Sequence, residues 1–301
     1  LYNYASGIIR AIGDARTPFY FLVLSTILNI FLDLFCIIYL KMGVSGAAVA
    51  TVIAQAVSGV LCVVYMYRKY QLLRPKRSEL VPDRRKCRVM LGMGLPMGLQ
   101  FSITAIGSVM LQSAVNMLGT VYVASYATAL KLKSIFIGVC DALGNTMAVY
   151  CGQNLGAGRK DRIRAGIAAS IKISVVLSVI SMAILWTLTD KLALLFMDAS
   201  NKQVIANVCL FMRCTSCFYI VLYLLCIFRN SVQGMGASKT AMFAGLIEMT
   251  ARTVSSLWLI PPLGYIMVCF TDQLAWGAAT VFLVLVFRSI MRRAPSADQL
   301  R

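Results

Sequence analysis

Long apolar runs, separated by short polar connections, dominate the sequence. A helix rises ~1.5 Å per residue, so about 20 apolar residues are enough to cross the ~30 Å hydrocarbon layer of a membrane. The pattern therefore predicts eight complete spanning helices, and the run from Leu1 to Ile9 is interpreted as the tail of an earlier span. The eight are Phe19 to Leu40, Val44 to Tyr67, Val89 to Leu118, Val121 to Val149, Ala165 to Leu188, Val204 to Phe228, Ala241 to Ile260 and Ile266 to Phe287.

The composition agrees with an all-α polytopic membrane protein. Hydrophobic residues make up 59% of the 301 residues, charged residues only 13%, and the mean hydropathy is +0.79. So many apolar runs exceed what one soluble core can bury. We therefore expect the lipid bilayer to surround most of the chain.

The formal net charge of +18 is unevenly distributed. If successive connections alternate between the two sides, 21 of the 29 Lys and Arg fall on one side and three on the other. This asymmetry predicts that the basic side, which includes the C-terminus, is cytoplasmic in a cell membrane. The basic connections contain only Tyr70 as an aromatic residue that could stack on a base, so nucleic-acid binding is not expected.

Cysteine and histidine usage argues against an enzyme or a metal site. The chain has ten Cys, nearly all within apolar runs, and no His. Cys214 and Cys217 have the spacing of metal ligands, but no second pair follows them. We expect no metal, no cofactor and no catalytic residues.

A short internal similarity links two distant parts of the chain. "RAIGDARTP" (Arg10 to Pro18) aligns without gaps with "QGMGASKTA" (Gln233 to Ala241), which pairs Gly13 with Gly236 and Thr17 with Thr240. Each stretch leaves one predicted span and enters the next. Paired halves are common among transporters. The polar connection 68–88 is expected to separate the two halves.

The segment "CGQNLGAGRKDRIRAG" (Cys151 to Gly166) is the remaining glycine-rich stretch. Its glycines fit neither a P-loop nor a dinucleotide-binding spacing, and a predicted membrane helix precedes it. We interpret Gly152, Gln153, Asn154 and Gly156 as a cytoplasmic turn, in which glycine permits left-handed backbone and close helix approach.

Four motifs together resemble the multidrug and toxic compound extrusion (MATE) transporters. They are "GIIRAIGDARTP", "GLPMG" at Gly94 to Gly98, "GQNLGAGRKDRIR" and "SVQGMGASKT". The resemblance implies twelve helices in two six-helix lobes, and a monomer that exports organic cations or drugs in exchange for Na⁺ or H⁺. The alternative is a lipid-linked saccharide flippase of related architecture, which would need a cavity rich in cations.

The resemblance also implies a division of the chain. Residues 1–67 would be the end of the first lobe, 68–88 a cytoplasmic linker, 89–288 the second lobe and 289–301 a cytoplasmic tail. Most of the first lobe would then lie outside this sequence.

Polar residues inside predicted spans are the candidates for a transport pathway, because they are costly in lipid. At 100° per residue, one face of the span from Val121 gathers Lys131, Ser134, Gly138, Asp141 and Asn145. Lys133 points the opposite way and is interpreted as a packing or snorkelling residue. A cavity-facing role and a structural interhelical bond both remain open for the polar face.

The span from Val89 carries Gln112 and Asn116, which either line the cavity or bond to another helix. Some family members carry a coupling glutamate after the proline of this helix. Here Gln100 and Thr104 follow Pro96 instead. The resemblance therefore favours ion coupling through the first lobe.

Two further pairs lie in other spans. Glu248 and Arg252 are four residues apart with the acid first, which predicts a self-neutralised ion pair, with a substrate role as the alternative. Asn29 and Asp33 share a face of the first complete span. We interpret Asp33 as a structural hydrogen-bonding acid, with a direct functional role as the alternative.

Overall fold

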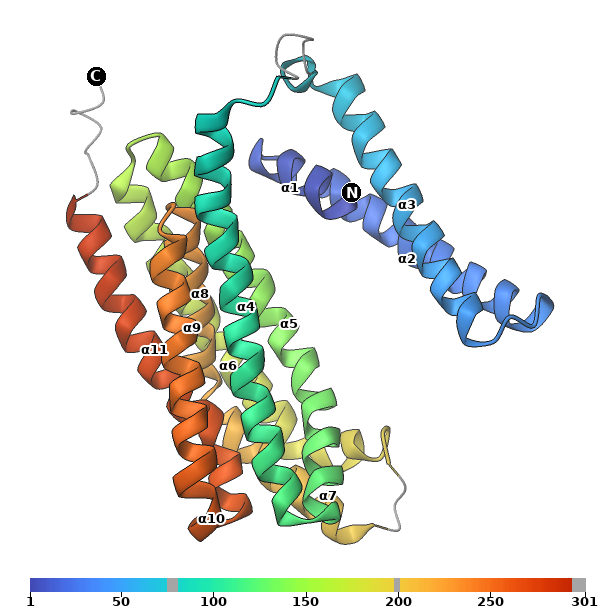
Figure 1. Cartoon of the computed structure of the whole chain (residues 1–301), viewed down its shortest axis with the longest axis vertical. Helices are drawn as coiled ribbons and strands as arrows, with labels where there is room; N and C mark the ends of the chain where they lie inside the picture. Colours follow the sequence, from blue (N-terminus) through green and yellow to red (C-terminus); the bar gives the residue numbers. More distant parts are fainter. Residues whose placement is uncertain (75–80, 198–200, 294–301) are drawn as a thin grey trace. The chain divides into compact units, whose positions relative to one another are not determined.

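The computed structural model describes residues 1–74, 81–197 and 201–293, and these contain helices and no strand (Figure 1). The all-α class is confirmed. Six helices are long and apolar enough to cross a membrane, or seven if a bent pair is one span. The predicted span from Ala241 to Ile260 is also helical, although its main helix is shorter than that criterion requires. The count of eight stays a prediction.

The chain divides into two compact units, of which the first is Leu1–Arg84. Its elements are α1 (Tyr2–Ala11), α2 (Arg16–Leu34), a π-helical turn η1 (Phe35–Tyr39), α3 (Val44–Lys69) and a 3₁₀ turn η2 (Gln71–Leu73). Helix α3 packs against both α1 and α2. The small core between them contains Ala5, Ile9 and Cys62.

The second unit is Arg85–Arg301. Its elements are α4 (Arg84–Leu118), α5 (Thr120–Gly156), α6 (Lys160–Ala193), α7 (Lys202–Ser216), α8 (Tyr219–Gly234), α9 (Ser238–Val254), a π-helical turn η4 (Ser255–Leu259), α10 (Ile260–Leu263) and α11 (Tyr265–Arg293). Helix α8 packs along α5 and α11, and α9 packs along α11.

The boundary between the units falls within the predicted linker 68–88, which is partly helical at η2 and at the start of α4. Residues 75–80 of that linker lie outside the described residues. In the predicted tail 289–301, α11 continues to Arg293, and residues 294–301 likewise lie outside the described residues.

The predicted span from Val204 to Phe228 consists of two helices, α7 and α8, with a 55° bend between them, and together they are long and apolar enough for one span. The carbonyl of Arg213 accepts hydrogen bonds from the hydroxyl of Ser216 at 2.8 Å and from the thiol of Cys217 at 3.3 Å. Side chains that bond a carbonyl one turn back compete with the helical hydrogen bonds and bend the helix. Trp186 of α6 donates to the Ser216 hydroxyl at 3.1 Å and holds the bend in place.

The structure confirms the internal repeat over the two aligned glycine turns. Gly13 after α1 and Gly236 after α8 both have positive φ, 105° and 87°. In each turn the glycine N–H bonds the carbonyl three residues back, at 3.0 and 2.9 Å. The next N–H bonds the carbonyl five residues back, at 3.3 and 3.1 Å. These two bonds define a Schellman helix end, so one turn occurs twice.

The correspondence continues to the last helix of each unit. Gly43 precedes α3 with φ 58° and ψ −136°, and Gly264 precedes α11 with φ 61° and ψ −146°. The stretch from Gly236 to Gly264 is slightly shorter than the stretch from Gly13 to Gly43, so the repeat contains a small deletion between its two glycine turns. Helices α1, α2 and α3 therefore correspond to the end of α8, α9 and α11.

A partly buried hydrogen-bond cluster fixes the start of α2. The Asp14 carboxylate accepts the Thr17 N–H at 3.1 Å and the hydroxyls of Thr17, Tyr65 and Tyr70 at 2.9, 2.9 and 3.1 Å. Burial alone raises the pKa of Asp14, but these hydrogen bonds outweigh it and lower that pKa to about 2. Asp14 is therefore a carboxylate at neutral pH and satisfies a free N–H in the first turn of α2.

Glycines let α5 and α8 approach each other closely. A Cβ on Gly152 of α5 would lie 2.9 Å from the carbonyl oxygen of Gly234, and a Cβ on Gly234 would overlap the carbonyl oxygen of Ala148. Neither helix can carry a larger side chain here without moving. Small residues at such crossings are typical of membrane helices, which gain packing contacts by close approach.

We predict that Gly234→Ala lowers the thermal unfolding midpoint by several degrees. The added methyl group forces α5 and α8 apart, and overpacking of this kind costs about 1–3 kcal/mol. Gly156→Ala is the matched control, because a Cβ at that helical position meets open space. Its midpoint should stay the same or rise slightly, since alanine favours helix. Equal midpoints for the two variants would contradict the close packing.

Candidate functional site

A chamber of about 490 Å³ opens inside the second unit, between α4, α5, α8, α9 and α11. Six charged side chains line it, three basic and three acidic: Lys133, Asp141, Arg229, Glu248, Arg252 and Asp272. Its polar residues include Thr104, Ser108, Gln112 and Ser134, and its aromatic residues are Tyr126 and Trp276. Such a volume is in the range of small-molecule sites.

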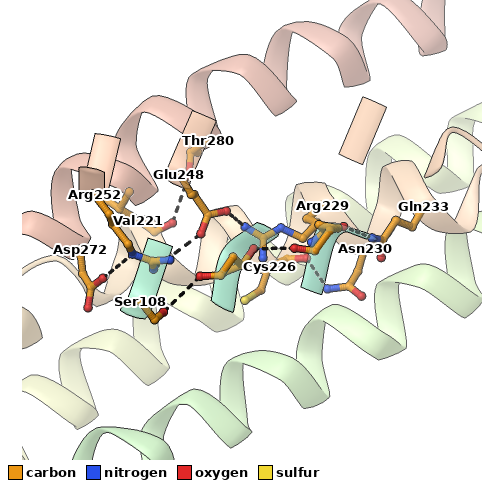
Figure 2. Close-up of polar contacts among 12 residues, drawn as sticks. Ser108, Val221, Cys226, Arg229, Asn230, Gln233, Glu248, Arg252, Asp272 and Thr280 are labelled. Carbon is orange, nitrogen blue, oxygen red and sulfur yellow. Dashed lines mark hydrogen bonds and ion pairs between the residues drawn. The ribbon is translucent and has the colours of Figure 1, made fainter. Parts of the chain in front are cut away.

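Five of these charged residues form one connected set of ion pairs, which we call the ion network: Lys133, Arg229, Glu248, Arg252 and Asp272. Figure 2 shows Arg229, Glu248, Arg252 and Asp272 of this network. Asp272 pairs with Lys133, and it also accepts the Arg252 Nε–H at 2.8 Å. Glu248 pairs with Arg229, and its Oε2 lies 3.8 Å from an Arg252 nitrogen. The network thus joins α5, α8, α9 and α11.

The ion network is buried. Its side chains are at most 7% exposed, except that of Arg229 at 16%. An isolated charge in such surroundings is costly, so each member depends on its partners. Lys133 gains a further contact from Trp276, whose ring centroid lies 4.8 Å from the Lys133 Nζ.

Asp141 lines the chamber without belonging to the ion network. It makes no ion pair with any residue that the structure describes, and its polar neighbour is the Cys226 thiol at 3.9 Å. The Asp141 side chain is therefore a carboxylate with free hydrogen-bonding capacity at the chamber wall.

The predicted ion pair of Glu248 and Arg252 forms, at 3.8 Å, but it is not self-neutralised. Their four-residue spacing does bring them to one face of α9, but the closer partner of Glu248 is Arg229 and that of Arg252 is Asp272. The spacing cannot show that two other helices bring charges to this face.

Two basic residues of the ion network depart from their sequence-based interpretation. Lys133, expected to pack or snorkel, is 4% exposed and pairs with Asp272 inside the bundle. Arg229, counted in a cytoplasmic connection, lies within α8, which continues past it to Gly234. Asp272 is absent from the predicted candidates, although an acid in the apolar run Ile266 to Phe287 is itself a signal of function or pairing.

The predicted polar face of α5 divides between two places. Ser134 and Asp141 line the chamber. Lys131 and Asn145 are exposed and do not line it, and the Lys131 Nζ lies 5.9 Å from the Phe196 ring centroid. The predicted polar face of α5 is therefore too wide for all of its residues to line the chamber.

On α4, Gln112 lines the chamber and donates from Nε2 to the Asn116 Oδ1 at 2.9 Å, whereas Asn116 is exposed. Gln100 is buried at 2% exposure and accepts the Gln233 Nε2–H at 2.6 Å. Gln100, at the place after Pro96 where some family members carry a coupling glutamate, thus forms an uncharged hydrogen bond between α4 and α8.

The two predicted residues of α2 belong to the first unit. Asn29 donates to the Thr51 hydroxyl at 3.4 Å. Asp33 is expected to be a hydrogen-bonding acid, but its Oδ1 is buried without a hydrogen-bond partner among the described residues. That oxygen does not play the predicted structural role.

The glycine-rich motif is mostly helical rather than a turn. Gly152, Gln153, Asn154 and Gly156 all lie in the last turns of α5, where the Asn154 side chain donates to the Tyr150 carbonyl at 2.8 Å. The left-handed residue is Gly158, with φ 68°. Gly152 provides the predicted close helix approach, and the turn begins after Gly156.

We predict that Asp272→Asn strongly destabilises the protein, because it leaves Lys133 and Arg252 buried with one acid fewer. Breaking a buried pair costs on the order of 3–5 kcal/mol. Asp161→Asn is the matched control: Asp161 pairs with Arg159 at 3.0 Å, but both side chains are about half exposed or more. Thermal unfolding in detergent should show a large drop for Asp272→Asn alone. Similar midpoints for both variants would contradict the ion network.

Comparisons with known proteins agree with this architecture. The chain is 30% identical to the probable multidrug resistance protein YpnP of Bacillus subtilis over 162 residues, which cover 54% of this chain and 36% of that protein. It is 25% identical to the probable multidrug resistance protein NorM of Thermotoga maritima over 296 residues, which cover 95% of this chain and 61% of that protein. The chain thus spans between about a third and three fifths of these relatives.

Solved structures and a family model give the same assignment. A crystal structure of MATE in complex with MaL6 superposes with a TM-score of 0.88 at 20% identity, covering 97% of this chain and 66% of that one. This likeness establishes the fold. The model of the MatE family matches residues 96–258, more than half of the sequence. This chain therefore belongs to the MATE family of transporters.

Proposed function

We propose that the chain is part of a secondary antiporter that exports organic cations or drugs in exchange for Na⁺ or H⁺. The observation that carries this proposal is the chamber, which combines a drug-sized volume, aromatic residues and an acid, Asp141, that has no ion-pair partner among the described residues. The names of YpnP and NorM, both probable multidrug resistance proteins, support small drug-like substrates.

Asp141 is the candidate for recognising a cation. The other two acids of the chamber, Glu248 and Asp272, are each held by at least two bases. Asp141 has no ion-pair partner among the described residues, and Tyr126 and Trp276 supply aromatic rings elsewhere in the chamber lining. A chamber that offers both a carboxylate and aromatic faces suits an organic cation.

Exchange follows if substrate and coupling ion compete for one carboxylate. A proton or Na⁺ on Asp141 removes the attraction for a cationic substrate, and the substrate in turn disfavours the ion. In an alternating-access cycle, binding of the substrate would then favour one conformation of the transporter, and binding of the coupling ion would favour the other. Coupling through the first lobe, as the family resemblance favours, remains compatible with this scheme.

The chamber gives little support to a lipid-linked saccharide flippase. A pyrophosphate group would need an excess of cations, whereas three acids accompany the three bases here. For the membrane arrangement, we propose a monomer in the cell membrane with a cytoplasmic C-terminus. The asymmetry of Lys and Arg supports that orientation.

We predict that Asp141→Asn in the full-length protein folds normally but transports a cationic dye less well. The amide keeps the shape of the side chain and removes its charge, so the apparent affinity should fall by about tenfold. Asp161→Asn is the control, since it removes an exposed acid outside the chamber. Uptake into proteoliposomes, normalised to inserted protein, measures the effect. Unchanged transport by Asp141→Asn would contradict the proposed role.

A further inference from the structure

The ion network contains one more base than acids. Lys133, Arg229 and Arg252 face only Glu248 and Asp272. Asp141 lies outside the ion network and brings the chamber as a whole to three acids and three bases. Within the network, Arg252 is the base that both acids share. In buried surroundings such a charge is retained at a cost unless something compensates it.

Arg252 also has a buried donor without a hydrogen-bond partner among the described residues. Its Nε bonds Asp272 at 2.8 Å, and a second nitrogen lies 3.8 Å from Glu248. Its Nη1 has no hydrogen-bond partner among the described residues, and the residue is 6% exposed. Arg252 lines the chamber, so a ligand there lies next to this guanidinium, whose Nη1 is itself buried.

The first unit shows that the fold does not require a charge at this position. Asn29 lies as far beyond Gly13 as Arg252 lies beyond Gly236, so the first pair of glycine turns makes these two residues counterparts. Thr51 likewise lies as far beyond Gly43 as Asp272 lies beyond Gly264. The second pair of glycine turns therefore makes Thr51 the counterpart of Asp272.

The same two positions interact in both units. The first unit joins them by a neutral hydrogen bond of 3.4 Å, and the second by a charged one of 2.8 Å. An amide and a hydroxyl are therefore sufficient to connect the two helices. The arginine adds a charge for which helix packing alone gives no reason.

We propose that Arg252 anchors a carboxylate of the transported molecule. The planar guanidinium suits the two oxygens of a carboxylate, and its Nη1 has no hydrogen-bond partner among the described residues. This inference rests on the proposed transport function and makes it more specific. Because Asp141 also lines the chamber, the favoured ligand carries both an amine and a carboxylate.

The test compares two forms of one xanthene dye on the purified chain in lipid nanodiscs. The form with a free benzoate is a zwitterion at neutral pH, and its methyl ester is a cation of nearly the same shape. Fluorescence anisotropy gives the dissociation constant of each. The unaltered chain should bind the free acid about tenfold more tightly than the ester, since a charge-assisted bond is available only to the acid.

Arg252→Gln should abolish this preference, because it weakens binding of the free acid and leaves the affinity for the ester nearly unchanged. The variant keeps one base for each acid of the ion network, so its unfolding midpoint should fall less than that of Asp272→Asn. Arg252→Lys should retain part of the preference, because it keeps the charge. Arg213→Gln is the matched control: Arg213 pairs with Asp190, is partly exposed and lies outside the chamber.

Each outcome decides between the proposals. A preference that persists in Arg252→Gln, or equal affinities in the unaltered chain, overturns the carboxylate site. If the ester binds in an Asp141-dependent way and the acid has no advantage, the transport proposal stands while the Arg252 inference fails. If neither form binds, the carboxylate inference and the chamber's proposed role both fail.

Discussion

The cost of burying charge inside an apolar helical bundle organises the second unit. Lys133, Arg229, Glu248, Arg252 and Asp272 come from four helices, and none of them can be left alone in that environment. Their pairing therefore fixes how α5, α8, α9 and α11 face one another. The same side chains form the wall of the chamber, so the stability of the unit and the chemistry of its site depend on one set of contacts.

Close packing of backbone complements this electrostatic constraint. The glycines where α5 crosses α8 bring the helices together on one side of the bundle, and the repeated Schellman turns set the entry into α2 and α9. The two units use the same turn but differ in the residues that follow. Asn29 and Thr51 give a neutral bond where Arg252 and Asp272 give a charged one. A shared scaffold thus carries different polar groups in its two copies.

Much of the fold follows from the sequence because apolar runs report membrane helices directly. The bend after Ser216 does not, since no proline or glycine marks it, and it depends on hydroxyl and thiol bonds to one carbonyl. The ion network is only partly predictable. Helical spacing places Glu248 and Arg252 on one face, but it cannot say which other helices meet that face. It likewise assigns Lys133 to packing, because a single helix does not show where its neighbour's acid lies.

The most direct test of this account is a double-mutant cycle between Lys133 and Asp272. Lys133→Met and Asp272→Asn are measured singly and together by thermal unfolding in the same detergent. If the pair is the buried interaction described here, the double variant should be more stable than the sum of the single effects predicts, by about 1 kcal/mol or more. The double variant removes one base and one acid together. The net charge of the ion network, now Arg229, Glu248 and Arg252, is therefore the same as in the unaltered chain. Additive effects of the two substitutions would show that Lys133 and Asp272 do not interact, and would contradict the ion network as the organising element of the unit.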